Sequence, residues 1–273
     1  MNIEEIKKSI RASWQRVIKN GGKLYQYRSC KDYNFDNLKE GLISLNRISS
    51  FNDLWEGRFE YFTEEVISQS KYSKFLTKES VEEIIKLNFN ANRENIYASC
   101  LSESKNSELM WAHYGDTYKG YIVEYDYTDT YQLIQSQSAA IFPIIYEDVV
   151  IDFSQLFVKL IDVYFENLLQ DVDHVNAEVR AVIASNTLLP QEAEYVNIFK
   201  KPDWSYEKEW RIMTTHPDDD ERIPITVKAS AVYMGSRISE VDKKRLMQIA
   251  SRNRIDVYQM STDIRGMNFT KIL

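Results

Sequence analysis

The sequence predicts a mixed α+β fold, in which a central sheet that is split or strongly bent carries a helical insertion or cap. Short segments of alternating apolar and polar residues recur along the chain, and segments with apolar residues at helical spacing lie between them. The chain has only 8 glycines and 5 prolines in 273 residues, and no flexible linker marks a boundary. We therefore expect residues 1–273 to form a single domain.

The N-terminal segments predict two helices and two strands. An amphipathic helix opens the sequence and ends at the glycine pair of residues 21–22, because glycine is common at helix C-caps. Residues 24–28 then predict a strand, residues 35–40 a short helix ended by Gly41, and residues 42–45 a second strand.

Two long segments predict helical insertions, at about residues 59–92 and 150–200. In the first, Ser80 and Glu83 have the spacing of a capping box. In the second, apolar residues recur at helical spacing, and strand-like alternation is weaker than elsewhere in the chain.

The remaining segments predict strands with short connections. Residues 231–235 and 255–260 flank a helix that begins at Ser239, which predicts a β-α-β unit closing the fold. The other predicted strands cover residues 95–103, 120–126, 141–146, 206–212 and 223–227, with a helical turn at residues 107–114.

Composition and charge narrow the class of protein. Apolar residues make up 44% and charged residues 27%, which is typical of a globular protein. The net charge of −7 argues against a broad duplex-binding surface, which needs a basic face. Cys30 and Cys100 form no CxxC pair, so we expect a reducing compartment and no disulfide framework. Early acidic residues and the lack of a long apolar run predict a cytoplasmic protein without a secretory signal or membrane span.

The densest polar chemistry lies in residues 204–212, which read W-S-Y-E-K-E-W-R-I. Because side chains alternate across a strand, Glu207, Glu209 and Arg211 are expected to share one face. Such a set is either an ion-pair ladder on a solvated edge strand or part of a cleft, and the segment alone leaves both interpretations open.

Two other clusters are candidates for ligand binding. Tyr25, Tyr27 and Arg28 combine aromatic rings with a guanidinium that can pair with phosphate, although this cluster taken alone favours a structural arginine. Asn52 lies in a turn-forming segment, where its side chain could instead bond the backbone. The second cluster consists of Ser99, Ser102, Trp111, His113 and Tyr114.

The histidines and acids are the residues of this sequence that could bind a metal ion. His113, His174 and His216 lack ligand spacing, so we expect no metal site of the histidine type. Asp203 could join the two glutamates, but no nuclease pattern is complete. Two acids on one strand face are poorly placed to flank a sugar as a glycosidase pair, and they suit the stabilisation of a cationic sugar transition state better.

The motifs together resemble a widespread bacterial family of domains of unknown function. This chain has F-N-D-L-W-E-G from residue 51 where the family usually reads FNDPFE, and S-C-L-S-E from residue 99 where it usually reads SLSE. M-W-A-H-Y from residue 110 and E-K-E-W-R from residue 207 complete the pattern. The resemblance spans Leu24 to about Met260.

The order of these parts also resembles, more weakly, the ADP-ribosyltransferase superfamily, although no S-T-S triplet is present. The resemblance implies that Arg28 contacts the phosphates of NAD and that Glu209 binds the ribose 2′-hydroxyl, while Glu207 selects or activates the acceptor. The other implied cofactor-binding residues are Tyr25, Tyr27, Asn52, Ser99, Ser102, Trp111, His113 and Tyr114.

The leading hypothesis is therefore an NAD-consuming mono-ADP-ribosyltransferase, acting as a toxin or phage-defence effector on a protein or nucleic acid. The alternatives are a non-catalytic module that binds a nucleotide or a partner and, third, a metal-dependent nuclease. Fold-level analogy does not decide among them.

Overall fold

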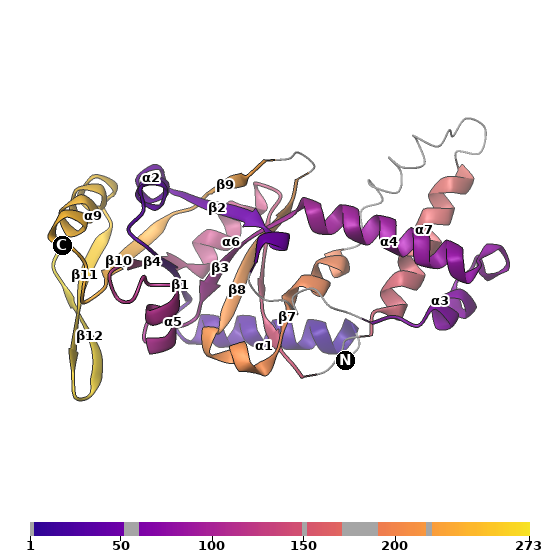
Figure 1. Ribbon diagram of the computed structural model, residues 1–273, viewed down its shortest axis with the longest axis horizontal. Helices are drawn as coiled ribbons and strands as arrows, with labels where there is room; N and C mark the ends of the chain where they lie inside the picture. Colours follow the sequence, from indigo (N-terminus) through magenta and orange to yellow (C-terminus); the bar gives the residue numbers. More distant parts are fainter. Residues whose placement is uncertain (1–2, 52–59, 149–151, 171–190, 217–219) are drawn as a thin grey trace.

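The computed structural model describes residues 3–51, 60–148, 152–170, 191–216 and 220–273, and it confirms the mixed α+β class. A large mixed sheet and helices α2 and α9 lie toward one end of the molecule, and the helices α3, α4 and α7 group at the other end (Figure 1). The helical group corresponds to the predicted insertions.

The first elements follow the sequence pattern closely. Helix α1 (Ile3–Lys19) buries Ile6, Ile10 and Val17, and it is followed by glycines at positive φ. Gly41 ends the second helix with φ 69°, and its N–H donates to carbonyls of the last turn. The elements that follow α1 are β1 (Lys23–Arg28), α2 (Asp32–Glu40), β2 (Leu42–Arg47) and η1 (Ile48–Ser50).

The first predicted insertion is not one continuous helix. It contains α3 (Thr63–Gln69), η2 (Ser73–Phe75) and α4 (Lys78–Asn95). The predicted capping box was wrong by one turn: Thr77 is the N-cap, and Ser80, which was expected to be the N-cap, is the third residue of the helix. Thr77 also offers a hydroxyl, so the true box is Thr77 with Ser80.

The strands predicted over residues 95–103 and 120–126 were confirmed, and one helix after them was missed. The single strand predicted over residues 141–146 is instead two short strands in different sheets. The elements are β3 (Ile96–Ser102), α5 (Glu108–His113), β4 (Tyr121–Asp126), α6 (Tyr127–Gln135), β5 (Ala140–Pro143) and β6 (Ile145–Tyr146). Helix α6 was not predicted; it begins where the Asp126 carboxylate accepts from the N–H groups of Thr128 and Asp129.

The second predicted insertion holds α7 (Ser154–Gln170), η3 (Gln191–Ile198) and the short strand β7 (Phe199–Lys200). The segment that follows corrects the prediction of a strand over residues 206–212. Residues Pro202–Glu207 form the 3₁₀ helix η4, and Lys208 has φ 45°. Strand β8 (Glu209–Thr215) therefore begins only at Glu209.

The C-terminal unit agrees with the prediction of β-α-β. Strands β10 (Ala229–Met234) and β11 (Asp256–Asp263) are parallel, and α9 (Glu240–Asn253) between them is N-capped by Ser239. A final strand that was not predicted, β12 (Gly266–Lys271), turns back along β11, and β9 (Arg222–Thr226) pairs with β2.

The sheet is split beside its central strand, β3. Strand β8 pairs with β3 over the whole length from Ile96 to Ser102. On the opposite side of β3, β1 pairs at Ser102, whereas β2 pairs at Ala98 and Tyr97. Between these points β1 and β2 diverge, which leaves an opening beside residues 99–101. The strand order is β12-β11-β10-β4-β1-β3-β2-β9, with β8 joining β3 to β5.

Candidate functional site

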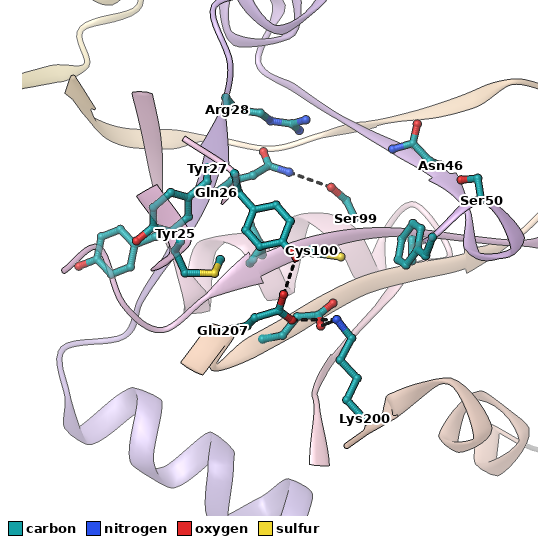
Figure 2. Close-up of a pocket in the computed structure, with 16 residues that line it drawn as sticks. Tyr25, Gln26, Tyr27, Arg28, Asn46, Ser50, Ser99, Cys100, Lys200 and Glu207 are labelled. Carbon is teal, nitrogen blue, oxygen red and sulfur yellow. Dashed lines mark hydrogen bonds and ion pairs between the residues drawn. The ribbon is translucent and has the colours of Figure 1, made fainter. Parts of the chain in front are cut away.

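A pocket of about 400 Å³ lies where β1 and β2 diverge from β3. We call it the split-sheet pocket. Seven of the residues predicted to form a site line it, and they come from β1, β3, the end of α5, η4 and β8. They are Tyr25, Tyr27, Arg28, Ser99, Tyr114, Glu207 and Glu209. Figure 2 shows Arg28 on one side of this pocket and Glu207 with Lys200 on the other.

One side of the pocket is a closed network of charges. The Lys200 ammonium lies 2.8 Å from Glu207 Oε2 and 2.7 Å from Glu209 Oε2. Arg211 donates to both oxygens of Glu209, at 2.7 Å from Nε and 3.3 Å from Nη2. The Tyr114 hydroxyl donates to Glu207 Oε1 at 2.6 Å. We call these five residues the acidic network.

The edge-strand interpretation of this segment was wrong. Strand β8 is paired on both sides, with β3 and with β5. Glu207, Glu209 and Arg211 are 3%, 4% and 0% exposed, so they form no solvated ladder. The expected strand alternation also fails to explain how the acids meet, because Glu207 lies on η4 and the left-handed Lys208 separates it from β8.

The two carboxyl groups are not equivalent. Burial alone would raise the pKa of Glu209, but Arg211 and Lys200 together outweigh it and lower that pKa to about 2. Burial also raises the pKa of Glu207, and the nearby charge of Glu209 raises it further. Lys200, the cation that Glu207 shares with Glu209, does not outweigh these two effects, so the pKa of Glu207 is raised overall. Glu207 is therefore the acid in this pocket that takes up a proton more readily.

The opposite side of the pocket is electrostatically open. Arg28 is half-buried at the end of β1, and no hydrogen bond or ion pair joins its guanidinium to another described residue. Gln26 and Ser99 bridge the opening, with Gln26 Nε2 donating to Ser99 Oγ at 2.8 Å. To a ligand, this side therefore offers several polar groups and a guanidinium that no described acid neutralises.

The tyrosines of β1 support the pocket more than they face it. The Tyr27 hydroxyl donates to the Ser104 carbonyl at 2.8 Å, and its ring packs edge-on against Trp111 at 5.4 Å. Tyr25 packs against Tyr233, and burial, followed by the nearby Glu124 carboxylate, raises the pKa of Tyr25 to about 12. Burial raises the pKa of Tyr27 as well, so both phenols stay protonated at neutral pH.

Three predicted residues lie outside the lining of the split-sheet pocket, and a fourth is not among the residues that the structure describes. Ser102 is fully buried and donates to the Glu207 carbonyl at 2.6 Å. Trp111 is also fully buried, with its indole N–H bonded to the Lys105 carbonyl. His113 is exposed beside a neighbouring pocket, and Asn52 lies outside the described residues.

Sequence reasoning missed Gln26, Asn46, Cys100 and Lys200, all of which line the pocket. A lysine is normally exposed, so nothing in the local sequence signalled a buried Lys200. Cys100 opens onto the pocket, but desolvation and the adjacent Glu209 carboxylate raise the pKa of its thiol. It is therefore a thiol at neutral pH, which is a poor nucleophile.

The described residues contain no cluster of three or more histidines, cysteines or acids placed to hold a metal ion. Asp203, which a nuclease would need as its third acid, is exposed on η4 and does not line the pocket. Among the described helices, none has the length and apolar character to cross a membrane.

Comparison with known proteins gives one match. No curated protein and no solved structure matches the chain significantly. A family model described as a protein of unknown function (DUF2971) matches residues 110–212, which run from α5 to β8. This range contains Tyr114, Lys200 and the acids of the network, and it excludes β1 with Arg28. Over less than half of its length, the chain is thus similar to a family whose function is unknown.

Proposed function

We propose that the split-sheet pocket binds a phosphate-bearing nucleotide, with NAD as the first candidate. The observation that carries the proposal is the Arg28 guanidinium, which lines the pocket with no hydrogen-bond or ion-pair partner among the described residues. A guanidinium presents a planar fork of donors that matches phosphate oxygens. A cavity of about 400 Å³ is within the usual range for small-molecule sites.

The other lining residues suit the rest of a nucleotide. Ser99, Gln26 and Asn46 offer donors and acceptors of the kind that bind ribose hydroxyls, and Tyr114 and Phe51 offer aromatic surface. Lys200 adds positive charge at the far side, although both acids already surround it. Phosphate binding is therefore assigned to Arg28 and not to Lys200.

The weaker resemblance suggests a reaction for NAD in this pocket. In ADP-ribosyl transfer, the bond between nicotinamide N1 and ribose C1′ breaks, and nicotinamide leaves with the bonding electrons. The acceptor attacks C1′ and loses a proton. A carboxylate near C1′ stabilises the developing positive charge. Glu207 and Glu209 both line the pocket, and Glu207 is the better candidate to receive the proton because its pKa is raised.

A specific observation favours a second candidate, a non-catalytic nucleotide-binding module. Two cations already balance the two carboxylates, and Glu209 accepts hydrogen bonds from Arg211 at both oxygens. A transferase needs an acid whose charge is directed at the sugar. In this second candidate the acidic network is a structural support, and only the open side contacts the ligand.

The binding proposal is tested by isothermal titration of the purified protein with NAD, NMN and AMP. We expect Arg28→Leu to weaken NAD binding at least tenfold, because a charge-assisted bidentate contact is lost. Arg252→Leu is the matched control, since Arg252 is exposed on α9 and does not line the pocket. No heat from any of the three nucleotides would overturn the proposal.

Catalysis is tested separately by the release of nicotinamide from NAD in the presence of cell lysate or DNA. The transferase predicts release by the wild-type protein and its loss in Glu209→Gln and Glu207→Gln variants that still bind NAD. Binding with no release under any condition selects the non-catalytic module.

A further inference from the structure

A second pocket of about 380 Å³ adjoins the first. It lies between the end of β1, the start of α2 and the end of α5. Tyr27, Arg28 and Tyr114 line both pockets, so Arg28 stands at their junction. A ligand that places a phosphate on Arg28 can therefore extend into either cavity.

Asn34 leaves one buried hydrogen-bond acceptor unsatisfied beside the second pocket. This side chain is 3% exposed and lines the pocket. Its Nδ2 donates to the Ser29 carbonyl at 3.0 Å. Because a carbonyl can only accept, the amide nitrogen must face Ser29, and the orientation of the amide is fixed. Oδ1 is buried and has no hydrogen-bond partner among the described residues.

The rest of the second pocket suits a planar ring next to a phosphate. Tyr33 and His113 are exposed aromatic side chains in its lining, and rings of this kind stack on nucleobases. Lys31 is a second cation in the lining besides Arg28, and Asp116 is the single acid of the lining. Two cations and one acid give this lining an excess of positive charge, which suits a ligand that carries phosphate.

We propose that the second pocket binds the far nucleoside of the same ligand, so that the substrate class is a dinucleotide with its diphosphate at Arg28. This inference rests on the proposed function. The base in the second pocket carries an exocyclic amino group, as adenine does, which donates to Asn34 Oδ1. The other nucleoside occupies the split-sheet pocket beside Glu207 and Glu209.

The test compares four probes by isothermal titration: NAD, its hypoxanthine analogue, NMN and AMP. A dinucleotide that fills both pockets should bind at least tenfold more tightly than NMN. The hypoxanthine analogue, which has an oxygen in place of the amino group, should lose most of this advantage because Asn34 Oδ1 then faces another acceptor. Asn34→Leu should bring the affinity for NAD toward that for NMN and remove the preference over the analogue.

Asn34 also holds the loop that follows β1, so a second variant is needed. His113→Ala changes an exposed side chain and should weaken NAD more than it weakens NMN. Equal affinities for NAD and NMN, unchanged in both variants, would overturn the dinucleotide inference and leave the binding proposal standing. Equal affinities for NAD and the hypoxanthine analogue would overturn the role of Asn34. If none of the nucleotides binds, the proposed function fails and this inference fails with it.

Discussion

Arg211 and Arg28 lie near the same pocket in opposite electrostatic states. Arg211 is fully buried and donates to Glu209 and to the Asn197 carbonyl. Arg28 is half-buried and has no such partner among the described residues. The first satisfies charges that the fold has already buried, whereas the second leaves donors for something that is not part of the described structure. A dense charged motif can therefore be structural, while a single arginine is the stronger indication of a ligand.

The largest expected difference between the two sides is in stability. Arg211→Leu leaves the buried Glu209 with Lys200 alone, so we expect the free energy of unfolding to fall by about 3–5 kcal/mol. Arg28→Leu removes no ion pair with a described residue and should change the free energy of unfolding by less than about 0.5 kcal/mol. Urea unfolding of both variants measures this. Equal losses would show that Arg28 also has a structural partner.

The pH dependence of stability should come from the closed side. The pKa of Glu209 is lowered from 4.5 to about 2 in the folded protein. A group with a lowered folded pKa contributes stability above its unfolded pKa, and the contribution is lost as the pH falls through the folded value. We expect about 3 kcal/mol to disappear between about pH 4.5 and 2.

Unfolding in urea at several pH values tests this dependence. The Glu209→Gln variant should lose less stability over the same interval. Glu207 acts in the opposite sense because its pKa is raised, so Glu207→Gln should fall at least as steeply as the wild type. A wild-type curve no steeper than that of Glu209→Gln would contradict the assignment.

A smaller effect is expected from the hydroxyl that caps the acidic network. Tyr114→Phe removes the donor 2.6 Å from Glu207 Oε1, and a hydrogen bond to a charged group contributes about 1.5–3 kcal/mol. Tyr27→Phe is the matched control on the open side, where the hydroxyl bonds a neutral carbonyl, and it should cost about 1 kcal/mol. Chemical unfolding compares them, and the reverse order would contradict the description of the network as the charged side.

The sequence predicted the fold well where the local pattern and the tertiary structure agree. Alternation predicted strand β1, Gly41 predicted the end of helix α2, and Ser239 predicted the start of helix α9. All three are local signals in the sequence. Helix α6 was missed because Asp126 ends a strand and caps a helix at once, which leaves no gap between them. The start of β8 was misplaced because the alternation of Glu207 and Glu209 continued through a left-handed residue.

The sequence predicted the motif residues of the candidate site, but it did not predict the residues that bond to them. Arg28, Ser99 and the two glutamates stood out by residue type and by resemblance, and they do line one pocket. Gln26 and Lys200 could not be found, because the position of Gln26 depends on the pairing of β1 with β3, and that of Lys200 on the pairing of β7 with β6. The split between β1 and β2 has no local signal at all.

The smallest expected effect concerns the bridge across this split. Ser99→Ala removes the hydroxyl that accepts from Gln26 at 2.8 Å, which should lower the free energy of unfolding by about 1 kcal/mol. Ser44→Ala, which breaks the bond to Asn37 outside the pocket, is a matched control of similar cost. The two variants should differ in NAD binding, because only Ser99 lines the pocket, and titration should show a several-fold loss for Ser99→Ala alone. Equal NAD binding by the two variants would show that Ser99 has only a structural role. Arg28 would then be the main ligand contact on the open side of the pocket.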